Sequence, residues 1–549
     1  GWVQPTTSTD FISTGYDWAK AVDEVYFARY GYNAFNYTDS DWAALEARRF
    51  DTKENPARPW VVVDDSGQYH YYGNFAWYDA LFNGNRFQQQ HDLSVSGGNK
   101  AVKYYVSGKY HDQQGLLSGP AIPVKEKFQS YGFRAKLDAK LFKWAKWSTN
   151  VSLYSVHQVY PGTLNEALTI SALDQALGPM FVPKNPDGSY VIYPNDIRKV
   201  GIGKGRGAIT TNENNRHDID ARTLALSNSL ELNPVKGLSI KATYNISNFF
   251  RLYRDRSLAA SYSDVLGKVV TNPAYSKDEY RERYYQYTTH SVDGVVSYNN
   301  LWNEAHNFTA LAGVNFETRR TTDLTVDQFG VGSEDLNTFN SVTDDTYYTI
   351  SQNITAYKTL GFFARVNYDY RGKYLVEVSM RADGTSRFAA GSRWGYFPSA
   401  SAGWRFSKEN FLKNASGWLS DGKLRFSYGA LGNQQVSDYL YLQTITSKEL
   451  PYLFDSNGKP KYSKVSDPMS SGLTWETVKT YNVGLDLSFL ENRLNFTGDY
   501  FVRQTKNMLT TSLTLPSVYG AATPTENCAD LRTNGWELSL SWKDSFKLA

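Results

Sequence analysis

Regular alternation of apolar and polar residues over residues 361–406 constrains the fold more than any other feature of this sequence. Residues one position apart in a strand point to opposite faces, so this period indicates strands with one apolar and one polar side. A tight turn at Arg371-Gly372 separates the first two arms, and a polar, glycine-containing excursion over residues 382–396 separates the second from the third. The apolar positions are Phe362, Ala364, Val366, Tyr368 and Tyr370, then Tyr374, Val376, Val378 and Met380, then Ala400, Ala402, Trp404 and Phe406.

The remainder of the chain repeats this order of strand, short turn, strand and long loop. With the end of a strand at residues 1–5, about sixteen strands are expected, and their long loops fall on one end while most short turns fall on the other. That asymmetry is typical of outer-membrane barrels. The first arm is the end of an expected strand over residues 348–370. Besides the three arms, the expected strands are residues 88–97, 102–111, 127–142, 147–159, 218–232, 238–250, 280–302, 306–320, 423–431, 480–489, 494–502 and 535–542.

Composition agrees with a barrel and excludes other classes. Aromatic residues make up 15% of the chain, with 41 Tyr and 14 Trp, and these residues favour strands and the boundary between apolar and aqueous phases. The net charge of only +3 provides no field for nucleic acid. The sequence has no run of about 18 apolar residues, which excludes membrane-spanning helices. Its mean hydropathy of -0.51 suits strands that alternate between lipid and lumen. We therefore expect an all-β, transmembrane antiparallel β-barrel with long extracellular loops and short periplasmic turns.

Six phrases carry a resemblance to a known family. Together they resemble the SusC-like TonB-dependent transporters of the outer membrane of Bacteroidota, and they occur in the order expected for that family. The phrases are HDLSVSGGN (residues 91–99), KYYVSGKYHDQQGLL (103–117), RADGTSRF (381–388), GYFPSASAGWRFSKENF (395–411), LRFSYGALGNQ (424–434) and TWETVKTYNVGLDLSFLENRLNFTGDYFVRQTKNML (474–509).

This resemblance implies a barrel of 22 strands closed by an N-terminal plug. It also implies a SusD-like lipoprotein that covers the barrel as a lid, and energy relayed by TonB. The substrate would be an oligosaccharide or, in some members, a peptide. Further surface glycan-binding lipoproteins and a dimer of SusCD pairs are possible partners. The plug, the TonB-binding segment and the aromatic last strand are not found in residues 1–549, so we interpret the chain as an incomplete barrel domain with about sixteen of the strands.

Aromatic residues in loops are the candidates for substrate binding. Strand aromatics are assigned mainly to the lipid face, whereas loop aromatics have no lipid to contact. Aromatic rings stack on the apolar faces of sugars, while neighbouring polar groups bind the hydroxyls. Packing of loop against loop, or against the lid, explains the same residues equally well. The candidates are Trp60, Tyr71, Tyr72, Trp77 and Tyr78 in an otherwise irregular segment with a short helix beginning near residues 39–41, and Tyr190 and Tyr193 in the loop over residues 160–215.

No pattern for catalysis, a cofactor or a metal is found. HExxH, CxxC and GxSxG are absent from the sequence, and a single cysteine, Cys528, leaves no intrachain disulfide. The alternative from another class is a secreted all-β glycan-processing enzyme, in which aromatic residues would form subsites around two carboxylates. The expected outward faces of residues 362–370 and 481–489 carry no charge, which favours lipid over water.

Overall fold

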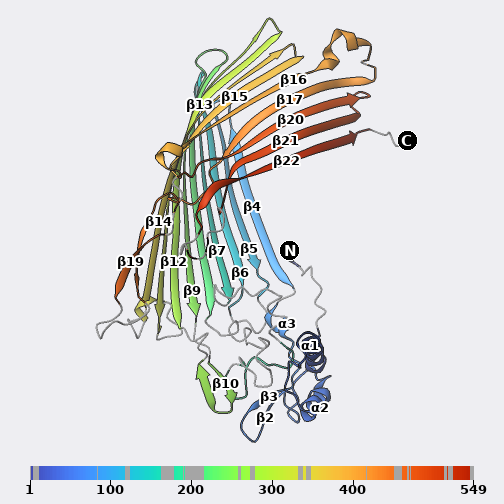
Figure 1. The fold of residues 1–549 in the computed structure, drawn as a ribbon, viewed down its shortest axis with the longest axis vertical. Coiled ribbons are helices and arrows are strands. Elements are labelled where there is room, and N and C mark those ends of the chain that lie inside the picture. The colour runs from blue at the N-terminus through green and yellow to red at the C-terminus, as the bar shows by residue number, and fades with distance from the viewer. Residues whose placement is uncertain are drawn as a thin grey trace.

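One sheet of 16 antiparallel strands forms most of the molecule (Figure 1). The computed structural model describes residues 2–3, 12–82, 85–117, 124–161, 178–189, 191, 215–257, 261–271, 278–331, 338–341, 348–415, 417–450, 460–466, 469, 472–511, 516, 518 and 523–544. In order across the sheet, the strands are β1 (Trp2–Val3), β4 (Arg86–Gly98), β5 (Val102–Gln114), β6 (Lys127–Phe142), β7 (Ala145–Pro161), β8 (Arg216–Leu232), β9 (Leu238–Ser257), β12 (Glu279–Trp302), β13 (His306–Phe329), β14 (Tyr348–Tyr370), β15 (Tyr374–Thr385), β16 (Trp394–Trp404), β17 (Leu419–Asn433), β20 (Glu476–Phe489), β21 (Leu494–Thr511) and β22 (Thr525–Trp542).

The expected number of strands and their antiparallel order are confirmed. Each strand of the large sheet pairs with the next one along the chain, and β1 and β22 lie at its two edges. Most strands are longer than the alternation alone indicates: β9 continues to Ser257 and β13 to Phe329. The reason is that hydrogen bonding between strands continues past the point at which the apolar face ends.

Most connections at one end of the sheet, which runs from the top to the right side of Figure 1, are short turns. Between β14 and β15, Arg371 (φ 53°) and Gly372 (φ 64°) are both left-handed. Three residues, 371–373, separate the paired Tyr370 and Tyr374, and the left-handed backbone of the first two is that of a hairpin turn whose twist matches its strands. The Asp369 carboxylate accepts a hydrogen bond from the Gly372 amide at 2.6 Å and closes the turn. The tight turn predicted at Arg371-Gly372 is confirmed.

Long connections lie at the opposite end, where β12 and β13 contain 24 residues each and β14 contains 23. A tilted strand needs only about 9–11 residues to cross a bilayer, so these three extend well beyond one. Two small hairpins occur in this region, β10 (Ser261–Val265) with β11 (Lys268–Thr271) and β18 (Ile445–Glu449) with β19 (Lys461–Val465). Short 3-10 helices are η1 (Phe339–Ser341), η2 (Ala390–Ser392), η3 (Phe406–Lys408) and η4 (Asn410–Ala415).

The two faces of the sheet differ as the alternation predicts. Val366 pairs with Val378 on the convex face, and their exposed fractions are 43% and 54%. The next pair, Asn367 and Glu377, lies on the concave face. Rows of exposed apolar side chains on one face and polar side chains on the other match a wall between lipid and an aqueous lumen. The expectation that Phe406 continues the apolar row of the third arm is wrong. Strand β16 ends at Trp404, and Phe406 begins η3.

The segment between β1 and β4 is not irregular, which corrects the expectation from sequence. It contains α1 (Gly15–Tyr30), α2 (Asp39–Arg48), the hairpin of β2 (Val61–Val63) and β3 (Tyr69–Tyr71), and α3 (Trp77–Leu81). The short helix expected near residues 39–41 is α2, and its first turn is closed by a capping box between Thr38 and Asp41. We call residues 12–82 the loop domain, which lies at the long-loop end in Figure 1. No helix in the described part of the chain is long and apolar enough to cross a membrane.

Candidate substrate-binding surface

The predicted aromatic residues that the structure describes lie inside the loop domain. Trp60, Tyr71, Tyr72 and Trp77 are all buried, and Tyr71 is only 1% exposed. Tyr71 and Tyr72 belong to a core that also contains Leu45 and Phe35 from the same domain and Met180 and Phe181 from the connection between β7 and β8. Tyr190, Tyr193 and the side chain of Tyr78 lie outside the described residues.

Each of three of these rings also makes a specific hydrogen bond. The Tyr71 hydroxyl donates to Asn185 Oδ1 at 2.8 Å, and the Tyr72 hydroxyl donates to Asp41 at 2.5 Å. The indole Nε1 of Trp77 donates to the carbonyl of Phe181 at 3.0 Å. These contacts join segments far apart in sequence, so the three rings stabilise loop packing in this conformation. Their role in substrate binding stays a prediction.

Asn185 is the residue at which three connections meet. Its Oδ1 accepts from Tyr71 of the loop domain, while its Nδ2 donates to the carbonyl of Ser263 in β10 at 3.0 Å. A second tie lies nearby, where the amide of Leu266 donates to the carbonyl of Gly67 at 2.7 Å. The connections β1–β4, β7–β8 and β9–β12 are therefore bound together over the long-loop end.

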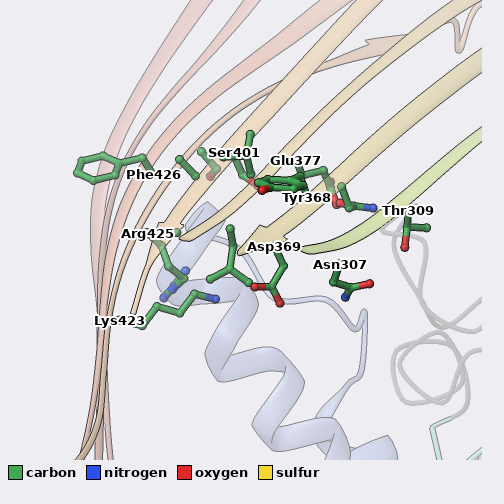
Figure 2. Close-up of a pocket in the computed structure, with 15 residues that line it drawn as sticks. Asn307, Thr309, Tyr368, Asp369, Glu377, Ser401, Lys423, Arg425 and Phe426 are labelled. Atoms are coloured by element: carbon green, nitrogen blue, oxygen red, sulfur yellow. The ribbon is translucent and has the colours of Figure 1, made fainter. Parts of the chain in front are cut away.

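The concave face of the sheet is the surface that the sequence analysis did not single out. Near the short-turn end it contains a hollow of about 500 Å³, between strands β13 and β17 (Figure 2). Most of its lining residues are at concave positions of their strands and carry amide, hydroxyl or charged groups. Those labelled in Figure 2 from this set are Asn307, Thr309, Asp369, Glu377, Ser401, Lys423 and Arg425.

Arg425 organises the charges beside this hollow. Its guanidinium forms a bidentate ion pair with Asp486 at 2.7 and 3.0 Å, and its Nη2 also lies 3.1 Å from Asp499. Two acids on β20 and β21 thus share one cation on β17. The arrangement requires Gly484, because a Cβ there would lie 2.5 Å from an Asp499 oxygen and 2.6 Å from the guanidinium carbon.

This surface can bind polar solutes through hydrogen bonds. Among the described residues, no group of three or more His, Cys, Asp or Glu side chains is placed to hold a metal ion. Sequence reasoning missed the surface because it searched the loops for aromatic residues. The signal available was the alternation within each strand. It places Asn367 and Glu377 opposite the apolar row, and the same alternation applied to the expected strand 423–431 would have placed Arg425 there too.

A wall with a lipid-compatible convex face and a polar concave face defines a protein of the outer-membrane barrel class. The family described as "TonB dependent receptor-like, beta-barrel" matches residues 165–549, and because this is more than half of the sequence, the chain belongs to that family. Its place is accordingly the bacterial outer membrane. Since members are receptors and not enzymes, the alternative of a secreted glycan-processing enzyme is set aside.

Curated relatives come from Bacteroidota and confirm the SusC-like resemblance. The TonB-dependent receptor P39 of Formosa agariphila is 27% identical over 460 residues, which are 83% of this chain and 41% of that protein. The TonB-dependent receptor SusC of Bacteroides thetaiotaomicron is 26% identical over 483 residues, 86% of this chain and 46% of the relative. The chain therefore spans less than half the length of these relatives.

Solved structures agree in fold. The RagAB peptide importer in its closed-closed state superposes with a TM-score of 0.74 at 22% identity, over 100% of this chain and 58% of the other. A second structure, of the RagAB peptide transporter, gives a TM-score of 0.71 over 99% of this chain and 58% of the other, again at 22% identity. At this identity the likeness is one of fold alone.

Proposed function

We propose that this chain forms the wall of a SusC-like, TonB-dependent importer of oligosaccharides. In this proposal a SusD-like surface lipoprotein closes the long-loop end, and TonB supplies the energy from the inner membrane. The concave face is the side along which the solute passes, and the convex face contacts lipid.

The observation that carries the choice of oligosaccharide is a pair of rings on the concave face. Phe249 of β9 and Tyr287 of β12 stack with their centroids 4.9 Å apart. Further along the same two strands, on the same face, the Asn245 amide donates to the Ser291 hydroxyl at 3.1 Å. Rings flanked by amide and hydroxyl groups suit a ligand that has apolar faces and many hydroxyls.

The loop domain supports the proposal of a lid. Val25 and Phe27 of α1 are exposed, and Phe50 after α2 is 83% exposed. These three side chains are available to a protein that docks on the domain. A SusD-like lipoprotein over the long-loop end would cover them.

An importer of oligopeptides is the second candidate. The RagAB structures, of a protein described as a peptide transporter and peptide importer, favour it through fold likeness. A peptide presents backbone amides to the wall, whereas an oligosaccharide presents hydroxyls, and the hydroxyl and amide groups described above can bind either one.

A binding titration separates the two candidates. The full-length protein, purified in detergent together with its lid, is titrated calorimetrically against a panel of neutral and acidic oligosaccharides and of peptides of similar length. We expect saturable heat with at least one oligosaccharide and none with the peptides. Binding of peptides alone would overturn the proposal in favour of the second candidate.

A further inference from the structure

Aromatic residues occupy concave positions where the sheet otherwise carries polar groups. In β9 the odd-numbered residues face the lumen, because their even-numbered neighbours Tyr244 and Ile240 belong to the exposed apolar row. Phe249 and Tyr253 are odd-numbered and lie on the concave face, and Tyr287 pairs with Phe249 across the sheet. Lipid cannot explain these rings, since they point away from it.

Arginines lie between the rings. The guanidinium carbon of Arg251 is 5.0 Å from the ring centroid of Phe249 and 5.6 Å from that of Tyr253. The guanidinium of Arg319, on β13, is 4.6 Å from Tyr287 and 5.8 Å from Tyr357 of β14. All four distances are within the range at which a cation is attracted to a ring face.

These groups form one continuous row across four strands, since the stacked Phe249 and Tyr287 join the two arginine sites. We call it the arginine-aromatic band, and its members are Tyr253, Arg251, Phe249, Tyr287, Arg319 and Tyr357. It lies toward the long-loop ends of its strands, far from the hollow of Figure 2 along the wall.

Two flanking arginines have acidic partners. Arg283 forms a bidentate pair with Asp323 at 2.6 and 2.8 Å, and Arg387 lies 2.9 Å from Asp438. Their charges are therefore compensated within the protein.

Arg251 and Arg319 differ from these two. Within the described ranges, neither forms an ion pair with a carboxylate, and the hydrogen bonds they donate go to the Tyr253 hydroxyl at 2.8 Å and the Thr289 hydroxyl at 2.9 Å. Glu317 is the nearest acid along β13, and it accepts from the Tyr357 hydroxyl at 2.6 Å. Since a guanidinium has five donors in a rigid plane, both arginines retain donors for an anionic ligand.

Ring contacts and one hydrogen bond each leave these two cations without an opposite charge among the described residues. A partly buried charge costs free energy unless an opposite charge or several hydrogen bonds compensate it. The strands here are already joined by complete backbone ladders, so the arginines are not needed to hold them together. A ligand that carries negative charge and also stacks on rings would compensate both groups at once.

We propose that the arginine-aromatic band binds acidic oligosaccharides, that is, sugars with carboxylate or sulfate groups. The rings of Phe249, Tyr287 and Tyr357 contact sugar faces, while Arg251 and Arg319 bind the acidic substituents. This inference rests on the proposed function, because it specifies which oligosaccharides pass along the concave face. It narrows the substrate class from sugars in general to charged ones.

The test compares four probes on the full-length protein purified with its lid. They are an oligogalacturonate, a sulfated galactan oligosaccharide, a neutral malto-oligosaccharide and an oligoglutamate peptide, all of similar length. We expect at least one of the two acidic sugars to bind at least tenfold more tightly than the neutral sugar, and raising sodium chloride from 50 to 500 mM to reduce the difference. The two acidic sugars distinguish carboxylate from sulfate.

Substitutions assign the effect to the band. Arg251→Gln and Arg319→Gln should each weaken acidic-sugar binding about tenfold, and the corresponding Lys variants should lose less because the charge remains. Arg222→Gln is the matched control, since Arg222 is an exposed arginine of β8 on the convex face. A heat-dependent shift in gel mobility checks that each variant is folded.

Different failures have different meanings. If neutral sugars bind as well as acidic ones, or if both Gln variants keep full affinity for the acidic sugars, the inference about the band is overturned while the importer of oligosaccharides stands. If only the oligoglutamate binds, the proposed function fails together with the inference.

Discussion

Arg425 of β17 holds Asp486 of β20 by two hydrogen bonds, 2.7 and 3.0 Å long, on the concave face of the sheet. The same guanidinium reaches Asp499 on β21, so three strands are joined by one side chain. Two carboxylates that share a cation repel each other once it is removed. The stability of this part of the wall therefore depends on Arg425, which compensates both carboxylates.

Replacing this arginine should destabilise the wall. We expect Arg425→Met to lower the free energy of unfolding by about 1–2 kcal/mol, because the two acids lose a charge-assisted partner on a surface that is partly solvated. Urea unfolding of the protein in lipid vesicles measures the change. Adding Asp499→Asn to this variant should restore part of the lost stability. If the double variant is no more stable than Arg425→Met alone, repulsion between Asp486 and Asp499 is not the cause of the loss.

The glycine beneath this arginine is needed for close approach. Gly484→Ala would place a methyl group 2.5 Å from Asp499 and 2.6 Å from the Arg425 guanidinium, so one of them must move. A loss of at least about 1 kcal/mol is expected. Gly429→Ala is the matched control on the neighbouring strand, because its Cβ would meet only the Ser399 hydroxyl at 3.6 Å. Equal effects of the two substitutions on urea unfolding would show that space is not the cause.

Adjacent residues on opposite faces test the assignment of lipid and lumen. Val366→Arg places a charge in the apolar row and should cost about 2 kcal/mol or more of folding free energy in a bilayer. Asn367→Arg, one position further, faces the lumen and should cost much less. Refolding yield into lipid vesicles compares the two variants. If Asn367→Arg proves the more damaging, the faces have been assigned the wrong way round.

Acidity should loosen the first helix of the loop domain. A hydrogen bond from the Thr14 hydroxyl and the Arg49 guanidinium hold the pKa of Asp17 below its usual range. A carboxyl whose pKa is lower in the folded state stabilises that state above its unfolded pKa, near 3.9, and loses this effect as pH falls through the folded value.

Asp17→Asn should therefore raise hydrogen exchange of residues 15–30 at pH 7, by the equivalent of about 1 kcal/mol or less. The difference from the natural protein should shrink as pH falls below about 4, which mass spectrometry at matched pH measures. Asp39→Asn is a control in the first turn of α2, for which no contact with Arg49 is found in the described structure. A difference of the same size at pH 7 and at pH 3 would contradict the ionic origin.

Strand alternation made most of the wall predictable. Val366 and Asn367 could be assigned to opposite faces from their positions alone, since the period of a strand is two. The extensions of β9 and β13 beyond the apolar rows were not visible, because past the lipid both faces of a strand can be polar. Likewise α1 lacks a strong apolar stripe and buries only Gly15, Tyr16, Ala19 and Asp23. Its sequence therefore has no apolar periodicity from which a helix could be predicted.

The candidate site was predictable only in part. Tyr71 and Tyr72 are loop aromatics as expected, but nothing in their local sequence says that a core forms around them. Phe249 and Tyr287 could have been found by searching each strand for aromatic residues on its polar face. The ring-to-arginine distances depend on the register between strands, which one sequence read alone does not fix.

One amide group has a mechanical consequence. Because Asn185 binds both Tyr71 and Ser263, three connections that leave different hairpins cannot swing independently. These three connections form one linked part of the rim, and a force applied to any of them is shared by the strands beneath all three. A partner that pulls on one of them would therefore move all three together.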